Sequence, residues 1–225
     1  MEHAHILSSG SSDKPRDGVL TKEQIRSRLP RIAATPCRTQ PGRTLKVRGD
    51  HDLNQGMGAP AKLRHASVLV PLVEREAGMT IIFTQRTAHL AAHAGQISFP
   101  GGGMEPSDHD AVATALRETL EEIGLEPERV EVAGRLDTYV TRTGFEITPV
   151  VGFIRPPFIL HPDPFEVAEV FEVPLEFFLK PGAARTETRQ FQGTQRHFYV
   201  FPYEHRYIWG ATAGMLVNLV DVLNE

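Results

Sequence analysis

The sequence predicts an α/β protein in which a mixed β-sheet is packed between helices, as an α/β/α sandwich. Apolar, β-rich runs recur from residue 67 to residue 202, and two pairs of runs are separated by short turns that favour hairpins. Patterns of amphipathic helix occur among these runs and again at the end of the chain. Helices interspersed with strands can cover both faces of a sheet, which is why these observations favour a sandwich.

The first 62 residues are expected to form an extension that precedes a domain over residues 63–225. Residues 1–18 are polar and rich in Ser, Gly and Asp, so we expect them to be poorly ordered. Residues 21–29 have the pattern of a short capped helix, and an irregular linker follows. Residues 22–48 contain eight Lys or Arg and one acid. We expect this basic extension to cover the domain or the partner subunit of a homodimer; an arm for nucleic acid or phosphate is the alternative.

Regular structure of the domain is expected to begin near His65. Two apolar runs around Glu-Arg-Glu-Ala-Gly predict one hairpin, and two around Thr-Arg-Thr-Gly predict a second. Pro174 is expected to open a short helix. The predicted strands cover residues 67–73, 79–86, 96–99, 130–136, 138–140, 145–154, 167–173 and 195–202, and the short and closing helices cover residues 175–179 and 211–223.

A further amphipathic helix is predicted in the middle of the chain. Ser107, with Asp110 three residues on, resembles an N-cap, and Gly124 occupies the position of a C-terminal capping glycine. One face is apolar, and the other carries carboxylates at positions i, i+3 and i+4, which are neighbours on a helix. The apolar face consists of Val112, Leu116, Thr119, Leu120 and Ile123, and the carboxylates are Glu118, Glu121 and Glu122.

Three neighbouring carboxylates repel one another unless a cation lies between them. Mg²⁺ is a hard cation that takes oxygen ligands, so this trio predicts a metal site that meets a phosphate-bearing substrate. A solvated acidic helix face is the alternative. The glycines from Gly101 to Gly103 precede the helix and let the backbone approach a ligand closely.

The stretch from Arg117 to Leu125 resembles the second half of the Nudix hydrolase signature, G-x5-E-x7-R-E-U-x-E-E-x-G-U, in which U is aliphatic. Thr119 occupies the first U position. The first half of the signature departs, because His109 stands eight residues before Arg117 where the signature has Glu. Asp108 follows Gly102 after five residues, so the loop is one residue longer than the signature.

A second segment, from Ile82 to Gly102, resembles the coenzyme A pyrophosphatase branch of that family, whose pattern is roughly L-L-T-x-R-S-x-x-L-R-x-H-x-G-Q-x-x-F-P-G-G. Ala91 departs where the branch usually has Arg. Residues 207–213 also resemble this branch, and the resemblance covers residues 63–215. The matching positions are Thr84, Arg86, Leu90, His93, Gly95, Gln96, Phe99, Pro100, Gly101 and Gly102.

The resemblance implies that Glu118, Glu121 and Glu122 bind the metal, Mg²⁺ or Mn²⁺, while one of them could instead act as a base on the attacking water. Arg117 lies within a turn of Glu121 and is expected to orient a carboxylate. Glu166 is the preferred loop carboxylate that reaches the metals or the water. Glu169 and Glu172 are its alternatives, and each of these three could also be a solvent-facing strand residue.

Arg is suited to bidentate phosphate contact, so Arg86 is expected to bind a substrate phosphate. His93 is a further substrate-binding candidate, with a structural role as the alternative. His89 and His109 are expected at the surface. Tyr207 and Trp209 are expected in the core, with a place in an adenine pocket as the alternative. The predicted substrate-binding residues are Arg86, His93, Gln96, Ser98, Gly101 and Gly102.

Composition excludes several classes of protein. A net charge of −4 argues against a nucleic-acid partner, and the single cysteine, Cys37, rules out an internal disulfide. The first residues lack the order of a signal peptide, and no apolar run approaches the ~20 residues of a membrane span. We therefore expect a cytoplasmic protein that has no membrane partner.

The resemblance implies a metal-dependent enzyme that hydrolyses the diphosphate of coenzyme A or its thioesters. The products would be 3′,5′-ADP and 4′-phosphopantetheine or its acyl form. A Nudix hydrolase of another nucleoside diphosphate derivative, such as NADH, ADP-ribose or a nucleotide sugar, is the first alternative. A Nudix module that binds a nucleotide without hydrolysis is the second.

Overall fold

A computed structural model describes the backbone of residues 5–6 and all of residues 20–30, 45–54, 56–58, 60–90, 93–191 and 193–225. Apart from residues 5–6, the predicted disorder of residues 1–18 lies outside these ranges, as do residues 31–44, 55 and 59 of the predicted linker. The described part of the linker is not wholly irregular, and regular structure begins before His65, because residues 47–49 form a strand that pairs with residues 138–140 of the domain. The helices are α1 (Lys22–Arg28), α2 (Ala111–Ile123), α3 (Leu175–Leu179) and α4 (Gly210–Asn224), with 3₁₀ turns η1 (Asp50–Asp52) and η2 (Pro127–Arg129). The strands are β1 (His5–Ile6), β2 (Val47–Gly49), β3 (Arg64–Arg75), β4 (Gly78–Arg86), β5 (Ile97–Ser98), β6 (Gly101–Gly103), β7 (Val130–Arg135), β8 (Thr138–Val140), β9 (Phe145–Ile154), β10 (Ile159–Leu160), β11 (Val167–Pro174), β12 (Arg185–Phe191), β13 (Thr194–Tyr203) and β14 (Arg206–Trp209).

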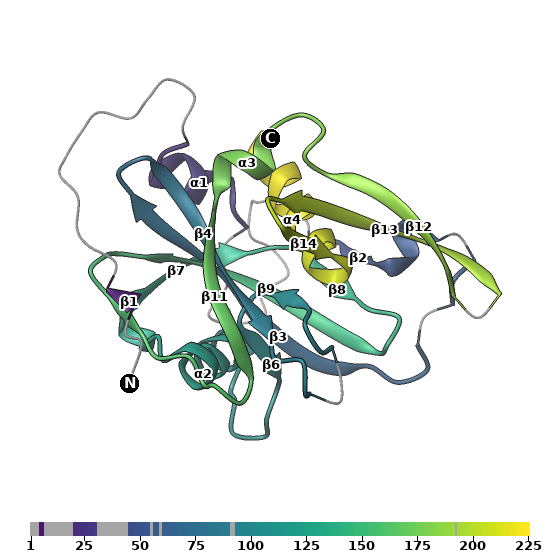
Figure 1. Ribbon diagram of the computed structural model, residues 1–225, viewed down its shortest axis with the longest axis horizontal. Helices are drawn as coiled ribbons and strands as arrows, with labels where there is room; N and C mark the ends of the chain where they lie inside the picture. The colour runs from purple at the N-terminus through teal and green to yellow at the C-terminus, as the bar shows by residue number, and fades with distance from the viewer. Residues whose placement is uncertain are drawn as a thin grey trace.

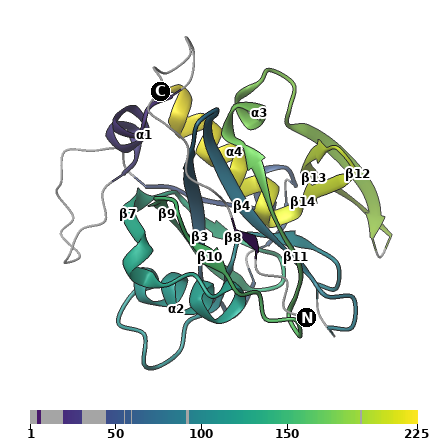
Figure 2. The same ribbon diagram turned by 60° about the vertical axis from the view of Figure 1, so that its left-hand side comes forward.

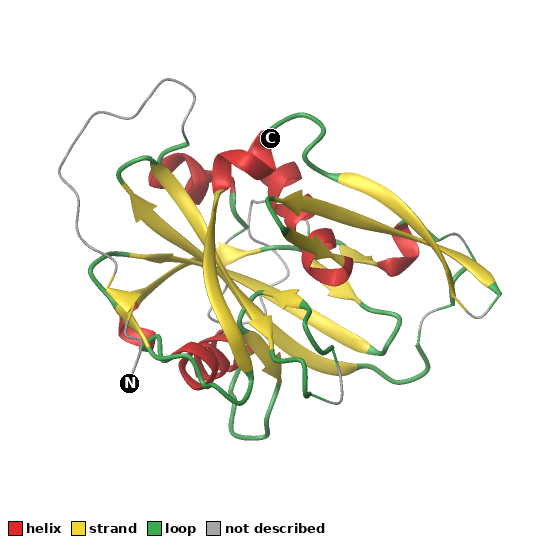
Figure 3. Cartoon of the chain, in the orientation of Figure 1, coloured by secondary structure: helices red, strands yellow, loops and turns green. Residues whose placement is uncertain are grey.

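A nine-stranded mixed sheet forms the centre of the described structure (Figures 1 and 3). Its main path runs β11-β4-β3-β9-β8-β2, while β5 pairs with β4, β6 with β3 and β7 with β9. The β3–β9 and β2–β8 pairs are parallel and the others are antiparallel, so the predicted mixed sheet is confirmed. Both predicted hairpins form, as β3–β4 and β8–β9.

Strand β3 is buried on both faces, and this gives the fold its three layers. Every residue from Ala66 to Val73 is buried. Since side chains alternate across a strand, Val70 and Leu72 join the apolar cluster that contains α4, whereas Leu69 and Val73 join the cluster that contains α2. The two helices therefore cover opposite faces of the sheet, as the predicted sandwich requires (Figure 2).

The N-cap of helix α2 lies three residues later than predicted. Ser107 does not cap it; Asp110 does, and its Oδ1 accepts a hydrogen bond of 2.8 Å from the Ala113 amide. The chain makes a turn before the helix, because the Glu105 amide donates to the Asp108 side chain and the Asp108 amide to the Glu105 carbonyl. Gly124 ends the helix with φ of 68°, as predicted.

The predicted division of α2 into an apolar and an acidic face is wrong at two positions. Leu120 was assigned to the apolar face, but 43% of it is exposed. Glu122 was assigned to the acidic face, but it is buried with only 5% exposed. The sheet therefore covers a face of the helix that is rotated toward Glu122, beside the fully buried Ala115 and Ile123.

The three-stranded sheet of β12, β13 and β14 packs outside the central sheet and was predicted only through β13. Strand β12 has no alternation of apolar and polar residues, and most of its residues are exposed. Its strand conformation follows from its full register with β13, from Arg185 opposite Val200 to Phe191 opposite Thr194. None of the helices in the described part of the chain combines the length and apolar character that a membrane span needs.

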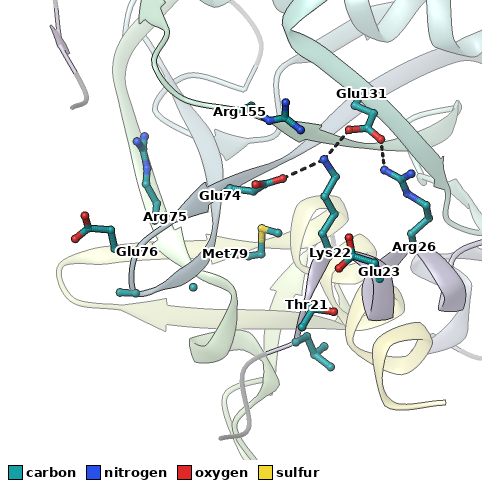
Figure 4. A pocket seen from close by; sticks show the side chains of 13 residues that line it. Thr21, Lys22, Glu23, Arg26, Glu74, Arg75, Glu76, Met79, Glu131 and Arg155 are labelled. Carbon is teal, nitrogen blue, oxygen red and sulfur yellow. Dashed lines mark hydrogen bonds and ion pairs between the residues drawn. The ribbon is translucent and has the colours of Figure 1, made fainter. Parts of the chain in front are cut away.

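The described part of the N-terminal extension packs against the domain. Thr21 caps α1 through a capping box with Gln24, and Ile25 is fully buried in the same apolar cluster as α4. A hollow of about 530 Å³ lies between α1 and the β3–β4 turn, and ion pairs cross it (Figure 4). Within this hollow, Lys22 Nζ lies 3.0 Å from Glu74 and 2.6 Å from Glu131. These contacts place the hollow at the end of β4 opposite to Arg86.

A buried carboxylate joins the extension to the last helix. The side chain of Asp137 has no exposed surface, and it accepts hydrogen bonds of 3.0 Å from the Lys46 amide, Arg48 Nε and Asn218 Nδ2. The Asp137 amide in turn donates to Asn218 Oδ1 at 2.8 Å. One side chain thus connects the chain before β2, the chain before β8 and helix α4.

Replacing Asp137 by Ala is expected to lower the free energy of unfolding by about 3 kcal/mol or more, because it leaves Arg48 and Asn218 without a buried partner. Asp221→Ala is the matched control, since Asp221 lies at the surface and its carboxylate is 2.8 Å from the same guanidinium of Arg48. That control is expected to change stability by less than about 1 kcal/mol. Urea denaturation measures both, and equal effects would contradict the prediction.

Candidate active site

The glutamates of α2 meet the glycine strand and Arg86 at one end of the central sheet. Glu122 Oε2 accepts a hydrogen bond from the Gly101 amide at 3.2 Å, and its other oxygen lies 3.5 Å from Arg86 Nη1. Both contacts depend on sheet register, because Gly101 pairs with Val68 of β3 and Arg86 ends β4. The structure therefore brings together residues that lie 36 positions apart in the chain.

Burial makes Glu122 difficult to ionise. Loss of solvent raises the pKa of this carboxyl to about 7, and the Gly101 amide and Arg86 counteract only part of that shift. The charges of Glu118 and Glu166 raise it further. Burial also raises the pKa of Glu118, against the lowering effect of Arg117. These carboxylates thus form a cluster of like charges that a cation would stabilise.

Arg117 organises the carboxylates on the outer side of this cluster. Its Nη1 donates to Glu121 at 2.9 Å, and its Nη2 lies 3.0 Å from Glu118, the Gly103 carbonyl and Asp108. Nε donates to the second oxygen of Asp108 at 3.0 Å, so that pair is bidentate. Such contacts are what an orienting role of Arg117 requires, and that role stays a prediction.

The sequence did not show whether Asp108 or His109 occupies the position of the first glutamate of the signature. The signature has Glu at the position of His109, but His109 is exposed and Asp108 faces the arginine. The bond from Arg117 and the Glu105 amide hold the pKa of Asp108 well below its usual range. The five-residue spacing from Gly102 was the only sequence signal for this residue.

Two positions of β6 leave no room for a side chain, the first because of neighbouring backbone and the second because of a carboxylate. Gly101 has φ of 151°, and a Cβ there would lie 2.4 Å from the Ser67 carbonyl oxygen. A Cβ on Gly102 would lie 2.4 Å from Glu118 Oε2, in the space that this carboxylate occupies. Gly103 differs, since a Cβ there would meet nothing within 4 Å. Gly102 thus lets the backbone lie directly against Glu118.

Glu166 reaches the site from the loop before β11. Its side chain lies 3.9 Å from Arg86 Nη2, and its charge contributes to the raised pKa values of Glu118 and Glu122. The loop is tied to the end of α2, because the His161 amide donates to the Ile123 carbonyl and the Asp163 amide to the Glu122 carbonyl. These bonds satisfy carbonyls that the helix end leaves free.

The two alternatives to Glu166 have other partners. Glu169 forms an ion pair with Arg206 of β14, and Glu172 pairs with Arg75 at 2.5 Å and accepts from Thr80. Of the three candidates, Glu166 is therefore the one that lies beside the glutamates of α2.

The remaining substrate-binding candidates lie beside this centre. Ser98 faces Thr84, with 3.3 Å between their hydroxyl oxygens. His93 Nδ1 lies 2.6 Å from Gln96 Oε1, so these two side chains contact each other. Tyr207 and Trp209 lie on the three-stranded sheet rather than in the core, half-buried beside Arg189.

The residues present fit a divalent cation by their donor set. Carboxylate oxygens are the ligands that Mg²⁺ and Mn²⁺ prefer, and the mutual repulsion of Glu118, Glu122 and Glu166 would be relieved by one. Among the described residues, no three His, Cys, Asp or Glu side chains already converge on one point, since Arg117 holds Glu118 and Glu121. Joint binding of a cation by the three helix glutamates therefore requires their side chains to rotate.

Comparison with known proteins agrees with this geometry. Residues 63 to 202 match the family model described as the NUDIX domain. A protein described as "Uncharacterized Nudix hydrolase NudL" from Citrobacter koseri is 43% identical over 162 residues, which cover 72% of this chain and 84% of that protein. A protein of the same description from Photorhabdus laumondii is 39% identical over 158 residues, covering 70% of this chain and 84% of that protein.

Solved structures give a weaker similarity. The Ap4A hydrolase of C. elegans, in a binary complex, is 20% identical with a TM-score of 0.43, over 49% of this chain and 80% of that one. A MutT/nudix family protein from Enterococcus faecalis is 17% identical with a TM-score of 0.42, over 75% of this chain and 63% of that one.

Gly102→Ala is expected to displace Glu118 without unfolding the protein, because the clash is with the flexible end of a side chain. We expect its affinity for Mn²⁺ to fall roughly tenfold or more, and its stability to change by less than about 1 kcal/mol. Gly103→Ala is the matched control and should bind Mn²⁺ as the wild type does. Calorimetric titration with Mn²⁺ and thermal unfolding test both variants, and unchanged affinity in Gly102→Ala would refute the role of this close approach.

Proposed function

The chain belongs to the Nudix hydrolase family and is a hydrolase of diphosphate substrates, and we propose that its substrate is coenzyme A or a coenzyme A thioester. The reaction would cleave the diphosphate to give 3′,5′-ADP and 4′-phosphopantetheine or its acyl form. Mg²⁺ or Mn²⁺ would be the cofactor, and the protein would act in the cytoplasm.

One observation carries the substrate assignment. Within the segment that resembles the coenzyme A pyrophosphatase branch, Arg86 faces the carboxylates beside the Gly101 amide and Gly102, and Gly102 is the glycine that the branch pattern shares with the family signature. The branch-specific part of the sequence and the family-wide part of the sequence thus form one site. This supports a branch-specific role for the segment in holding the substrate, beyond a role in the stability of the fold.

Arg86 is well placed to hold a phosphate. Its Nε is buried and has no hydrogen-bond partner among the described residues, while its Nη atoms lie 3.5 Å from Glu122 and 3.9 Å from Glu166. A guanidinium can offer two parallel bonds to one phosphate, and a turn of this side chain toward the substrate would give its Nε an acceptor. Arg86 would therefore fix the diphosphate beside the glutamates.

Glu118, Glu121 and Glu122 would hold the cation, with Arg117 orienting the first two. A bound Mg²⁺ or Mn²⁺ supplies positive charge to the phosphates and lowers the pKa of a water molecule. Glu121 and Glu166 are the two candidates to accept a proton from the attacking water. Glu166 makes the longer ion pair of the two. Its carboxylate lies 3.9 Å from Arg86, whereas Arg117 donates to Glu121 at 2.9 Å.

Product analysis by mass spectrometry tests the proposal. Incubation with coenzyme A and Mg²⁺ or Mn²⁺ should yield 3′,5′-ADP and 4′-phosphopantetheine, and a chelator should abolish both products. Glu121→Gln is the inactive control, and it should still bind the substrate. Cleavage of NADH or ADP-ribose alone would discard the coenzyme A assignment, and binding without turnover of any of the three would favour a nucleotide-binding module.

Glu166→Gln is expected to lower kcat about 100-fold or more if Glu166 acts on the attacking water, because a positioned base contributes about that factor. Glu169→Gln is the matched control on the same segment, since Glu169 pairs with Arg206 away from the site. Steady-state kinetics of the two variants on the cleaved substrate decide the point. A similar kcat in both would exclude Glu166 as the base.

A further inference from the structure

An exposed aromatic pair lies at the rim of the site. Phe165 is 63% exposed, more than any other large apolar side chain described. Its ring centroid lies 4.7 Å from that of His89, which is also exposed, and the two rings are tilted by 59°. Single apolar residues on a surface are common, so exposure alone would not distinguish Phe165. Phe165 is distinguished by its position next to Glu166 and by the hydrogen bonds that fix its backbone.

Both rings belong to residues that are close in sequence to residues of the site. Phe165 precedes Glu166, and His89 follows Arg86 by three residues. Between them, the Thr87 amide donates to the Glu166 carbonyl at 2.9 Å, and the Thr87 hydroxyl donates to the Phe165 carbonyl at 2.8 Å. The rings are thus carried by two chain segments that are bonded to each other next to Arg86 and Glu166.

The backbone that carries Phe165 is constrained on both sides. The Phe165 amide donates to the Asp163 side chain at 2.8 Å, and the Val167 amide donates to the Asp163 carbonyl at 2.8 Å. The chain at Asp163 is itself bonded to the end of α2. An aromatic side chain on such a fixed backbone loses little conformational entropy when a ligand stacks on it.

The chemistry of the pair favours a flat ligand. A nucleobase is rigid and has a π-face, and stacking on an exposed aromatic ring is a common way for proteins to bind one. A flexible chain such as pantetheine would lose rotational freedom on an open ring and would gain little contact in return. The nucleoside half of a diphosphate substrate carries its base one ribose away from the phosphate.

We propose that Phe165 and His89 form a stacking platform for the nucleobase of the diphosphate substrate. This inference rests on the proposed function, because it takes a nucleoside diphosphate derivative as the substrate. Phe165 supplies the stacking surface, and His89 supports it from the side. Phe165 thereby determines specificity for the base, while the glutamates and Arg86 recognise the phosphates.

Calorimetric binding of AMP and of ribose 5-phosphate tests the platform, because the two ligands share a phosphate and differ by the base. In the presence of Mg²⁺, the wild type should bind AMP at least about tenfold more tightly. Phe165→Ala should remove that preference and leave the affinity for ribose 5-phosphate unchanged, whereas Phe165→Tyr should retain it. Phe191→Ala is the matched control, since Phe191 is an exposed phenylalanine on the β12–β13 hairpin.

Three outcomes would overturn the proposal: a base preference that persists in Phe165→Ala, a wild type that does not prefer AMP, or a loss of 4′-phosphopantetheine binding in place of AMP binding. The binding assay is independent of hydrolysis. If the base preference depends on Phe165 while coenzyme A, NADH and ADP-ribose are not cleaved, the platform stands and the proposed function fails. If coenzyme A is cleaved and Phe165→Ala has wild-type affinity for AMP, the function stands and the platform fails.

Discussion

Repulsion among carboxylates is the constraint on which the rest of the site depends. Glu121 and Glu122 lie in the last turn of α2, at the negative end of the helix dipole, and Glu118 and Glu166 add their charges nearby. An unpartnered cluster of this kind would destabilise the fold. Arg117 and Arg86 compensate it from two sides, and the Gly101 amide contributes a third favourable contact. Because these groups come from different segments, the site can form only when the whole sheet is in register.

Strand β3 sets that register. It pairs with β6 and so fixes the glycine strand that lies against Glu118 and Glu122, and it also pairs with β9 and with the first residues of β4. The end of β4 that carries Arg86 is held by its pairing with β11 and β5. Its side chains pack into two different apolar clusters, so a shift by one residue would place each side chain among neighbours that it does not fit. The loop that carries Glu166 is bonded to the end of α2. The charged groups thus lie on backbone that packing and hydrogen bonds hold in place, which a preorganised site requires.

The strands, helices and residue groupings that could be predicted from the sequence are those that depend on local pattern. Apolar runs located β3, β4, β9 and α4, and helical spacing grouped Glu118, Glu121 and Glu122 on α2. It could not predict which of these carboxylates would be buried, because that depends on how the sheet covers the helix. Ser107 and Asp110 are both good caps, and the turn at Asp108 decides between them. Strand β12 has a polar sequence and forms because β13 pairs with it, and the side-chain contact between Asp108 and Arg117 depends on a loop whose length departs from the signature.

In the proposed function the charged centre would recognise features that all diphosphates share, a pair of phosphates and a cation, so it would not by itself choose among them. Selection between substrates requires groups that contact what differs, namely the parts attached on either side of the diphosphate. The chain that follows Arg86 and the chain that precedes Glu166 both adjoin the charged centre, and the two are bonded through Thr87. Side chains there can change without altering the sheet register or the balance of charge. Substitutions in these two segments are therefore expected to change substrate choice while leaving the carboxylates and arginines in place.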